Sequence, residues 1–387
     1  MDIKKRGVMK KLGIIGATGS IGIQTIEVIR KFKNLYKIEF LVSYSNYKKL
    51  FEIANEFNVK KVGIIRDDIE VKNENFIIYK GKDEILNLIE EIDLLFVSTT
   101  GIFSIFPVLK AIEKNINIAL ANKEVLVSFG KIVNEKLKTS NSIIIPVDSE
   151  HSAIFQLINP YKNDFIRIIL TASGGPFLNL SIEEMENVSI EMALNHPTWK
   201  MGKKITIDSA TLFNKSLEII EAYYLFGTKN IDVIIHPQSI VHSFVQLKDG
   251  SLLAHLGFPD MRIPIAYALS YPDRLETPSI ITHPYDFDKL TFLKPDFEKF
   301  PSLKIAYFCL EKCSYYPTIM NASNEIAVYS FLEGKINFRD IFVVVEETLN
   351  RIEKEKLRDE TLEDLLYVDY LSRIIANSIV SEISKKR

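Results

Sequence analysis

The sequence predicts an α/β protein in which a parallel sheet is followed by an α+β region and a helical bundle. Short runs of β-forming residues alternate with helical patterns over residues 1–147. That alternation is typical of a mostly parallel sheet with helices on both faces. Strands and helices mix without it over residues 148–270, and from Ser302 onward the apolar residues recur at helical spacing.

The alternating region contains the elements of a doubly wound sheet. The expected strands are 11–15, 38–43, 61–65, 93–98, 116–121 and 142–147. The expected helices are 20–33, 48–57, 82–92, 103–114 and 131–139. The central strands are apolar, as expected for a sheet that is buried on both faces. We therefore expect residues 1–147 to form a first domain.

The rest of the chain is expected to form a second domain, a linker and a third domain. In residues 148–270 the expected strands are 167–172, 233–236, 239–247 and 252–256, and the expected helices are 182–186 and 212–225. The turn sequence at residues 248–251 predicts a hairpin and antiparallel pairing. Residues 271–301 hold five prolines and are expected to be a linker, and 302–387 a helical domain.

The composition excludes several classes of protein. The 48 Lys and Arg nearly balance the 50 Asp and Glu, so nucleic acid or an anionic membrane is not expected as the main partner. We find no bilayer-spanning run and no export signal. Cys309 and Cys313 lack the spacing of a disulfide framework or a CxxC motif and are expected to pack within a helix. Cysteine usage therefore favours a reducing, cytoplasmic location.

A glycine-rich turn links the first expected strand to the first expected helix. Gly16, Gly19 and Gly22 follow the pattern GxxGxxG. Glycines at such a turn let the backbone approach a pyrophosphate at a helix N-terminus, although a merely tight turn is the alternative. The second strand ends in Ser43-Tyr44-Ser45-Asn46 without the acid that binds the ribose of NAD. The sequence therefore predicts a Rossmann-like domain that prefers NADP.

Acidic residues follow the sixth expected strand. If this segment is extended, Asp148 and Glu150 point to the same side, at the edge where parallel sheets bind ligands. Glu218, near the start of an apolar helix, offers a third carboxylate. Three carboxylates suit Mg²⁺ or Mn²⁺, while a solvated acidic turn is the alternative.

Several polar residues suit a phosphate group. They supply two hydroxyls, an imidazole, an amide and an ammonium: Ser173, His196, Ser209, Asn214 and Lys215. The only tryptophan, Trp199, lies among Pro and Gly residues, so residues 173–203 are either a lid over a substrate or a loop with a core-filling aromatic. Lys123 follows the fifth strand and is either a surface charge or a cation that faces the substrate. The histidines His236 and His242 are either core residues or ligands.

Longer strings carry a resemblance to a known family. They are GATGSIG at 16–22, LANKE at 120–124, PVDSEHSAIFQ at 146–156, TASGGPF at 171–177, HPTWKMGKKITIDSATLFNKSLEIIEA at 196–222, HPQSIVHS at 236–243, FPDMRIPIAYAL at 258–269 and NASNEIAV at 321–328. The chain resembles the 1-deoxy-D-xylulose 5-phosphate reductoisomerase family over essentially its whole length. This family acts in non-mevalonate isoprenoid biosynthesis.

The resemblance implies an activity and a set of site residues. The activity is rearrangement and NADPH-dependent reduction of 1-deoxy-D-xylulose 5-phosphate to 2-C-methyl-D-erythritol 4-phosphate by a homodimer that uses Mg²⁺ or Mn²⁺. The implied metal ligands are Asp148, Glu150 and Glu218, which with Lys123 form the implied catalytic set. The implied substrate contacts are Lys123, Ser149, Glu150, Ser173, His196, Trp199, Met201, Ser209, Asn214, Lys215 and Glu218. The implied cofactor contacts are Gly16, Thr18, Gly19, Ser20, Ile21, Ser43, Ser45, Asn46, Asn122, Glu124 and Gly202.

Two other functions are compatible with parts of the sequence. A different NADP-dependent dehydrogenase, of the homoserine or semialdehyde type, would account for the glycine turn. It would not account for the acidic strings or the strings around Trp199. A non-catalytic nucleotide-binding sensor would keep the fold, but every expected ligand residue is present, which argues against decay of the site.

Overall fold

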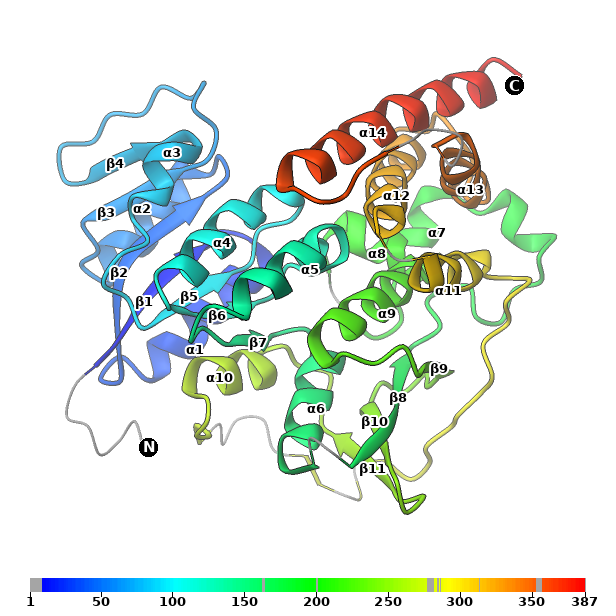
Figure 1. Cartoon of the computed structure of the whole chain (residues 1–387), viewed down its shortest axis with the longest axis horizontal. Helices are drawn as coiled ribbons and strands as arrows, with labels where there is room; N and C mark the ends of the chain where they lie inside the picture. Colours follow the sequence, from blue (N-terminus) through cyan, green and yellow to red (C-terminus); the bar gives the residue numbers. More distant parts are fainter. Residues whose placement is uncertain are drawn as a thin grey trace. The chain divides into compact units, whose positions relative to one another are not determined.

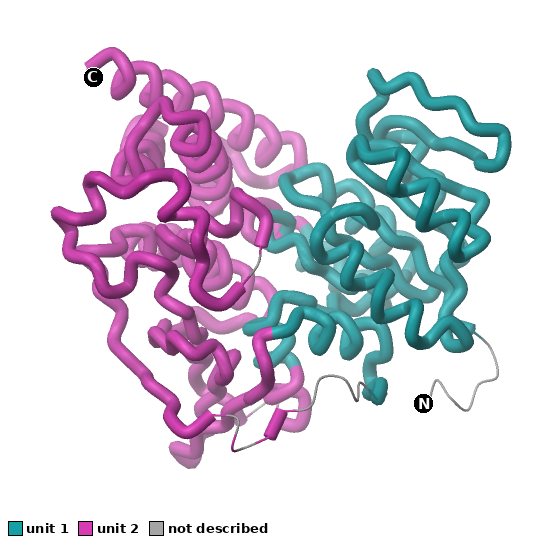
Figure 2. The backbone as a smooth tube through the Cα atoms, turned by 180° about the vertical axis from the view of Figure 1, so that it is seen from behind, with its two compact units in different colours: residues 1–125, 133–155, 260–281 teal, residues 126–132, 156–259, 282–387 magenta. Residues whose placement is uncertain are grey.

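The protein consists of two compact units, each made of several stretches of chain (Figures 1 and 2). The structure is a computed structural model that describes residues 9–161, 164–199, 201–276, 282–283, 285, 287–312, 314–352 and 357–386. The first unit comprises residues 1–125, 133–155 and 260–281, and the second comprises 126–132, 156–259 and 282–387. This division follows packing, whereas the domain boundaries expected from the sequence follow chain order and stay a prediction.

The first unit is built on a seven-stranded sheet, as the α/β prediction requires (Figure 1). The strand order is β4-β3-β2-β1-β5-β6-β7 and every neighbouring pair is parallel. The strands are β1 Lys10–Ile15, β2 Tyr36–Ser43, β3 Lys61–Ile64, β4 Ile77–Lys80, β5 Leu94–Val97, β6 Asn117–Leu120 and β7 Ile144–Pro146. The sequence did not predict β4, because this short edge strand has no buried residue and lacks the apolar pattern of the others.

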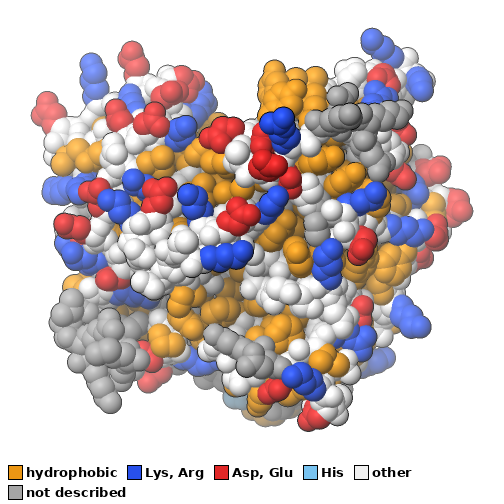
Figure 3. All heavy atoms as spheres, in the orientation of Figure 1, with side chains coloured by type: hydrophobic (Ala, Val, Ile, Leu, Met, Phe, Trp, Pro, Cys, Tyr) orange, Lys and Arg blue, Asp and Glu red, His pale blue; other side chains and the backbone are white. Residues whose placement is uncertain are grey.

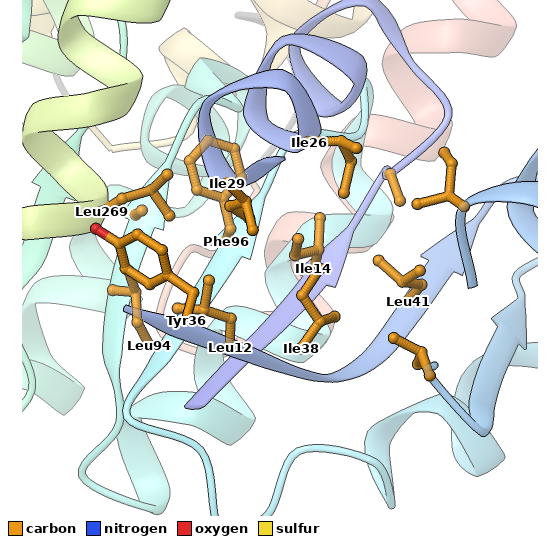
Figure 4. Packing of buried hydrophobic residues seen from close by; sticks show 14 of the residues in the cluster. Leu12, Ile14, Ile26, Ile29, Tyr36, Ile38, Leu41, Leu94, Phe96 and Leu269 are labelled. Atoms are coloured by element: carbon orange, nitrogen blue, oxygen red, sulfur yellow. The ribbon is translucent and has the colours of Figure 1, made fainter. Parts of the chain in front are cut away.

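Helices cover both faces of this sheet. They are α1 Ser20–Lys31, α2 Tyr47–Glu56, α3 Gly81–Leu86, α4 Ile105–Glu113, the start of α5 Lys123–Leu137, most of α6 Ser149–Ile158, and α10 Arg262–Ser270. On one face, α1, α2 and α10 pack on the sheet in a single apolar cluster. Figure 4 shows side chains of this cluster meeting one another: Ile26, Ile29, Leu12, Phe96 and Leu269. Each such buried side chain contributes about 1.5–3 kcal/mol to folding.

The strand order reverses between β1 and β5, and the glycine-rich turn lies at that point. Gly16 follows β1 with φ +89°, a conformation that favours glycine. Gly22 lies in α1, where an added Cβ would come within 2.1 Å of the Gly16 carbonyl oxygen. The absence of a side chain therefore allows α1 to start directly over the end of β1, which is where doubly wound folds bind ligands.

The second unit contains a four-stranded mixed sheet with the order β11-β10-β8-β9. Its strands are β8 Phe165–Ala172, β9 Ile231–Ile235, β10 Val241–Leu247 and β11 Leu252–Leu256. The predicted hairpin is confirmed, because residues 248–251 join the antiparallel strands β10 and β11. Antiparallel pairing is not general, since β8 and β9 are parallel. Helices connect these two strands, so β9 returns in the same direction as β8.

Helices complete the second unit, including the predicted C-terminal bundle. They are η4 Glu184–Asn187, α7 Ile190–Leu194, α8 Lys203–Ala210, α9 Phe213–Phe226, α11 Pro301–Lys312, α12 Tyr316–Leu332, α13 Asp340–Ile352 and α14 Leu362–Ser384. Helix α12 packs against α13, α14 and α8, which connects the bundle to the middle of the chain. Cys309 is buried in α11, as predicted, and Cys313 lies outside the described residues.

One condition set out from the sequence is not met, and one expected helix start is wrong. Residues 148–150 are not extended, because α6 begins at Ser149 and places Glu150 in its first turn. Helix α5 begins at Lys123 rather than at residue 131, because the Asn122 side chain accepts a hydrogen bond from the Val125 N–H and caps the helix. In both places the helix start is marked by a favoured N-cap residue, Asp148 or Asn122, directly after a buried strand.

The mixture of charges on the surface agrees with the near balance of basic and acidic residues in the sequence. Figure 3 shows Lys and Arg intermixed with Asp and Glu on the visible face. Among the described residues, no helix is both long and apolar enough to cross a membrane.

The glycine-rich turn gives a first prediction. We expect Gly22→Ala to lower the free energy of unfolding by about 1–3 kcal/mol, because the new methyl group overlaps the Gly16 carbonyl. Gly19→Ala is the matched control, since its Cβ would lie 3.4 Å from that same oxygen and its φ is −78°. We expect that variant to lose less than about 1 kcal/mol. Urea unfolding followed by circular dichroism measures both, and equal losses would contradict the packing argument.

Candidate active site

The turn after β1 places the first group of predicted cofactor residues. Gly19 is the N-cap of α1 and makes no side-chain cap bond, and both Gly19 and Ser20 are exposed. Thr18 and Ile21 lie on either side of them and are partly buried. The N–H groups in the first turn of a helix have no acceptor within the helix. The turn therefore presents donors and a positive helix end, which fit a pyrophosphate.

The end of β2 places the second group. Ser43 is buried, and its hydroxyl has no hydrogen-bond partner among the described residues. Ser45 follows and is partly buried, and Asn46 caps α2 by accepting a hydrogen bond from the Lys49 N–H at 3.2 Å. No carboxylate lies in this turn sequence, and Lys48 beside it is exposed.

Asn122 fixes the loop at the ends of β5 and β6. Its Nδ2 donates to the carbonyl oxygens of Thr99 at 2.7 Å and Gly101 at 2.9 Å. Nδ2 also lies 3.2 Å from the Ser104 hydroxyl, while Oδ1 caps α5. The polar atoms of the Asn122 side chain are thus hydrogen-bonded within the protein. These bonds hold in place the backbone next to Lys123 and Glu124.

Lys123 and Asp148 form a buried ion pair. Lys123 opens α5 just after β6, and Asp148 follows the neighbouring strand β7, so the two reach the same edge of the sheet. Lys123 Nζ lies 2.6 Å from Asp148 Oδ2, and the side chains are 7% and 15% exposed. Next to them the Ser149 hydroxyl donates to the Glu150 carboxylate. The first unit therefore brings together a cation, a hydroxyl and two carboxylates.

In the second unit a histidine lies between two serine hydroxyls. Ser173 follows β8, Ser209 lies in the last turn of α8, and His196 lies in the loop after α7. His196 Nε2 is 3.1 Å from Ser173 Oγ and 3.0 Å from Ser209 Oγ. Three groups predicted to bind phosphate thus meet at one place.

Backbone contacts define the protonation of His196. Its Nδ1 accepts hydrogen bonds from the N–H groups of Thr198 at 3.1 Å and Trp199 at 2.9 Å. A ring nitrogen that accepts carries no proton, so the proton of the neutral ring is on Nε2. Burial lowers the pKa of His196 below its ordinary value, which favours this neutral ring. Nε2–H is therefore a donor that points at the two serines.

A close backbone approach holds this arrangement together. Gly175 has φ +67°, and a Cβ there would lie 2.7 Å from the Ser209 carbonyl oxygen. Only a glycine lets the loop after β8 rest on the last turn of α8 in this way. The Gly175 N–H also donates to Ser173 Oγ at 3.3 Å. The separation of the two serines is therefore set by backbone packing.

Helix α9 carries the remaining polar residues of the second unit. Leu212, with φ 57°, separates α8 from α9 and lets α9 begin at Phe213. Asn214 Nδ2 and Lys215 Nζ both donate to the Glu218 carboxylate, one to each oxygen. Lys215 and Glu218 are buried. The carboxylate predicted to bind metal thus has its charge compensated by a lysine.

The segment predicted as a lid is attached to the histidine through its backbone. Trp199 and Met201 are partly buried, and Gly202 is exposed and is the N-cap of α8. The backbone N–H of Trp199 donates to His196 Nδ1, so the backbone of this segment is bonded directly to the imidazole.

Comparison with known proteins identifies the family. Family models described as 1-deoxy-D-xylulose 5-phosphate reductoisomerase, its C-terminal domain and the DXP reductoisomerase C-terminal domain match residues 12–130, 144–226 and 256–375. The 1-deoxy-D-xylulose 5-phosphate reductoisomerase of Clostridium botulinum strain Okra is 45% identical over 374 residues, which cover 93% of this chain and 97% of the relative. The chain belongs to the 1-deoxy-D-xylulose 5-phosphate reductoisomerase family. The resemblance drawn from the sequence strings is thereby confirmed.

Other reductoisomerases are similar to a comparable degree. The Persephonella marina protein is 45% identical, with 93% of this chain and 95% of the relative covered. The reductoisomerase of Zymomonas mobilis in complex with NADPH has a TM-score of 0.88 and 37% identity, covering 96% of this chain and 99% of that one. A DOX-P reductoisomerase in complex with NADPH, fosmidomycin and magnesium has a TM-score of 0.89 and 37% identity, covering 96% and 98%.

Sequence reasoning missed two buried residues of the second unit that contact one another next to Ser209. Asp208 precedes Ser209, and Asn324 lies in α12 within the string NASNEIAV. They are hydrogen-bonded although 116 residues separate them. The strings that contain them were part of the resemblance, but no local pattern indicated that they meet.

The protonation of His196 gives the second prediction. We expect its pKa to lie below about 6.5, the ordinary histidine value, and its proton to be on Nε2 at pH 7.5. The unfolded chain then takes up this proton first, so the free energy of unfolding decreases as the pH falls through about 6.5 toward the folded pKa. Imidazole ¹⁵N and ¹H NMR, assigned with His196→Gln, measures both properties. A midpoint at or above 6.5, or an Nδ1–H tautomer, would contradict this assignment.

Proposed function

We propose that this protein converts 1-deoxy-D-xylulose 5-phosphate to 2-C-methyl-D-erythritol 4-phosphate with NADPH and a divalent cation. The observation that carries the proposal is 45% identity to reductoisomerases over 93% of the chain. The polar clusters of both units support it, because each contains residue types that this reaction needs.

The second unit supports recognition of a phosphate group. Ser173, Ser209 and the Nε2–H of His196 can donate to its oxygens, and serine hydroxyls can turn from the imidazole toward a ligand. Asn214 and Lys215, which begin α9, add an amide and an ammonium. Because the phosphate is remote from the reacting carbons, its binding energy can be used to orient the substrate. The coupling of Trp199 to His196 supports a lid that closes over the bound substrate and excludes water.

The carboxylates support a divalent-cation site. We propose that Asp148 and Glu150 from the first unit and Glu218 from the second bind one Mg²⁺ or Mn²⁺. Carboxylate oxygens are the donors that these hard cations prefer. Lys123 and Lys215 compensate the charges of Asp148 and Glu218, which keeps these ligands in place before the cation binds. When bound, the cation polarises the substrate carbonyl and NADPH supplies a hydride.

The glycine-rich turn and its neighbours support an NADPH site. The backbone N–H groups of Thr18, Ser20 and Ile21 fit the pyrophosphate, while the Gly19 N–H donates to the Gly16 carbonyl oxygen at 3.0 Å. The turn at 43–46 has no carboxylate that would repel a 2′-phosphate, and Lys48 lies beside it. Asn122 fixes the loop at the sheet edge, so residues 122–124 can define one wall for the nicotinamide, with Gly202 contributing from the second unit.

Assembly, location and the preferred metal are parts of the proposal that rest on the family resemblance or on composition. We expect a homodimer and a cytoplasmic enzyme, and we expect Mn²⁺ to replace Mg²⁺ in activity. Sedimentation equilibrium of the purified protein measures the first of these.

The activity itself is the third prediction. We expect purified protein to oxidise NADPH when 1-deoxy-D-xylulose 5-phosphate and Mg²⁺ are added, as followed by absorbance at 340 nm. Addition of a chelator should stop this oxidation. Excess Mg²⁺ should restore the rate. NADPH binding without oxidation at any metal concentration would contradict the proposed reaction and favour a nucleotide-binding sensor.

The metal site gives the fourth prediction. We expect Glu218→Gln to lower kcat by at least about 100-fold, because the amide lacks the negative charge with which a carboxylate holds a divalent cation. The dissociation constant for NADPH, measured by fluorescence, should stay within about twofold of that of the parent protein. Glu311→Gln, an exposed substitution on α11, is the matched control and should keep full activity. Turnover of Glu218→Gln near the parent rate would show that Glu218 is not a metal ligand.

A further inference from the structure

A buried carboxylate lies in the same helical turn as the hydroxyl of Ser209. Asp208 is 1% exposed and is the preceding residue of α8. Its Oδ2 lies 2.7 Å from Lys204 Nζ, one turn earlier on the same helix. Its Oδ1 accepts a hydrogen bond of 2.8 Å from Asn324 Nδ2, on α12. A buried carboxylate is stable only when it is paired and hydrogen-bonded, so Asp208 requires both partners.

A second hydrogen bond attaches the end of α8 to the C-terminal helices. The Ser302 hydroxyl of α11 donates to the Thr211 carbonyl oxygen at 2.6 Å. Thr211 is the C-cap of α8, and its own hydroxyl donates back to the Ile207 carbonyl at 2.9 Å. The last turn of α8 is therefore fixed from α11 through its backbone and from α12 through Asp208.

The position of the Ser209 hydroxyl depends on this turn. Ser209 Oγ lies 3.0 Å from His196 Nε2, while the Ser209 backbone packs on Gly175 without room for one added carbon. A small rotation of the turn would move the hydroxyl away from the imidazole. A donor that is displaced by up to about 1 Å loses most of the binding energy of its hydrogen bond.

We propose that Asp208 and Asn324 are positioning residues that hold the Ser209 hydroxyl in place to bind the phosphate of the substrate. This inference rests on the phosphate site of the proposed function. Neither residue contacts the phosphate. The amide of Asn324 orients the carboxylate of Asp208, and that carboxylate fixes the rotation of α8 about its own axis.

Helix α12 offers a matched control. Asn321 lies one turn before Asn324, is equally buried, and also donates one hydrogen bond from Nδ2, at 3.2 Å to Ser128 Oγ. In both residues Oδ1 has no partner among the described residues. The two asparagines thus differ chiefly in what they hold, since Ser128 belongs to α5 and Asp208 to α8.

The test compares Asn324→Ala with Asn321→Ala in the full-length enzyme. We expect both variants to lose similar thermal stability. Only Asn324→Ala should raise the KM for 1-deoxy-D-xylulose 5-phosphate and the inhibition constant of inorganic phosphate, each by about tenfold. Its kcat and its dissociation constant for NADPH should stay within about threefold of the parent values. If the alanine variant does not fold, Asn324→Ser and Asn321→Ser give the same comparison with smaller changes.

Ser209→Ala tests the phosphate site independently of the positioning role of Asp208 and Asn324. We expect it to weaken inhibition by inorganic phosphate, because a direct donor is removed. If Ser209→Ala weakens phosphate binding while the two asparagine variants behave alike, the positioning role is wrong and the phosphate site stands. If Ser209→Ala leaves phosphate binding unchanged, the phosphate site is wrong and the positioning role fails with it.

Discussion

The need to pair carboxylates that are removed from water shapes the polar cluster of each unit. Asp148 lies beside Lys123 in the first unit, and Glu218 lies beside Lys215 in the second. Removing such groups from water costs several kcal/mol per ion, which only a close counter-charge and hydrogen bonds offset. The two lysines therefore stabilise the folded chain by compensating these carboxylates, whatever they contribute to a reaction. Their presence gives acidic side chains a fixed position at low exposure, which is what a divalent cation requires of its ligands.

Backbone approach supplies the rest of the geometry. In the first unit the lack of a side chain at Gly22 lets α1 begin over the end of β1, and in the second Gly175 lets a loop rest on α8. In both places main-chain packing positions the polar groups for which ligand binding is proposed. Such contacts restrict the position of donors more tightly than long side chains can, because they leave no rotamers to adjust.

The sequence predicted the parts of this structure that local patterns encode. Strand–helix alternation and the turn at Gly16 predicted the parallel sheet, and strand ends predicted that Lys123 and Asp148 lie on one edge. Helix α6 was missed although Asp148 is a favoured N-cap residue, because the acidic run was interpreted as cation ligands rather than as a helix start. The bond between Asp208 and Asn324 could not be predicted from periodicity, since two polar residues in helical segments look like solvent-facing positions until tertiary packing buries them. Both residues lie within the strings that carry the family resemblance, but those strings do not indicate that the two side chains are in contact.

The tautomer of His196 connects the site to the rest of the second unit. Its Nδ1 is occupied by backbone N–H groups of the segment that carries Trp199, so the ring can offer only Nε2–H to a ligand. An anion at Nε2 strengthens that donor and, through the ring, the acceptor character of Nδ1. At the proposed phosphate site, binding of the anion and ordering of residues 198–199 would therefore favour each other. Under the proposed function, the imidazole that binds the phosphate would also stabilise the closed position of the lid, without any contact between Trp199 and the phosphate.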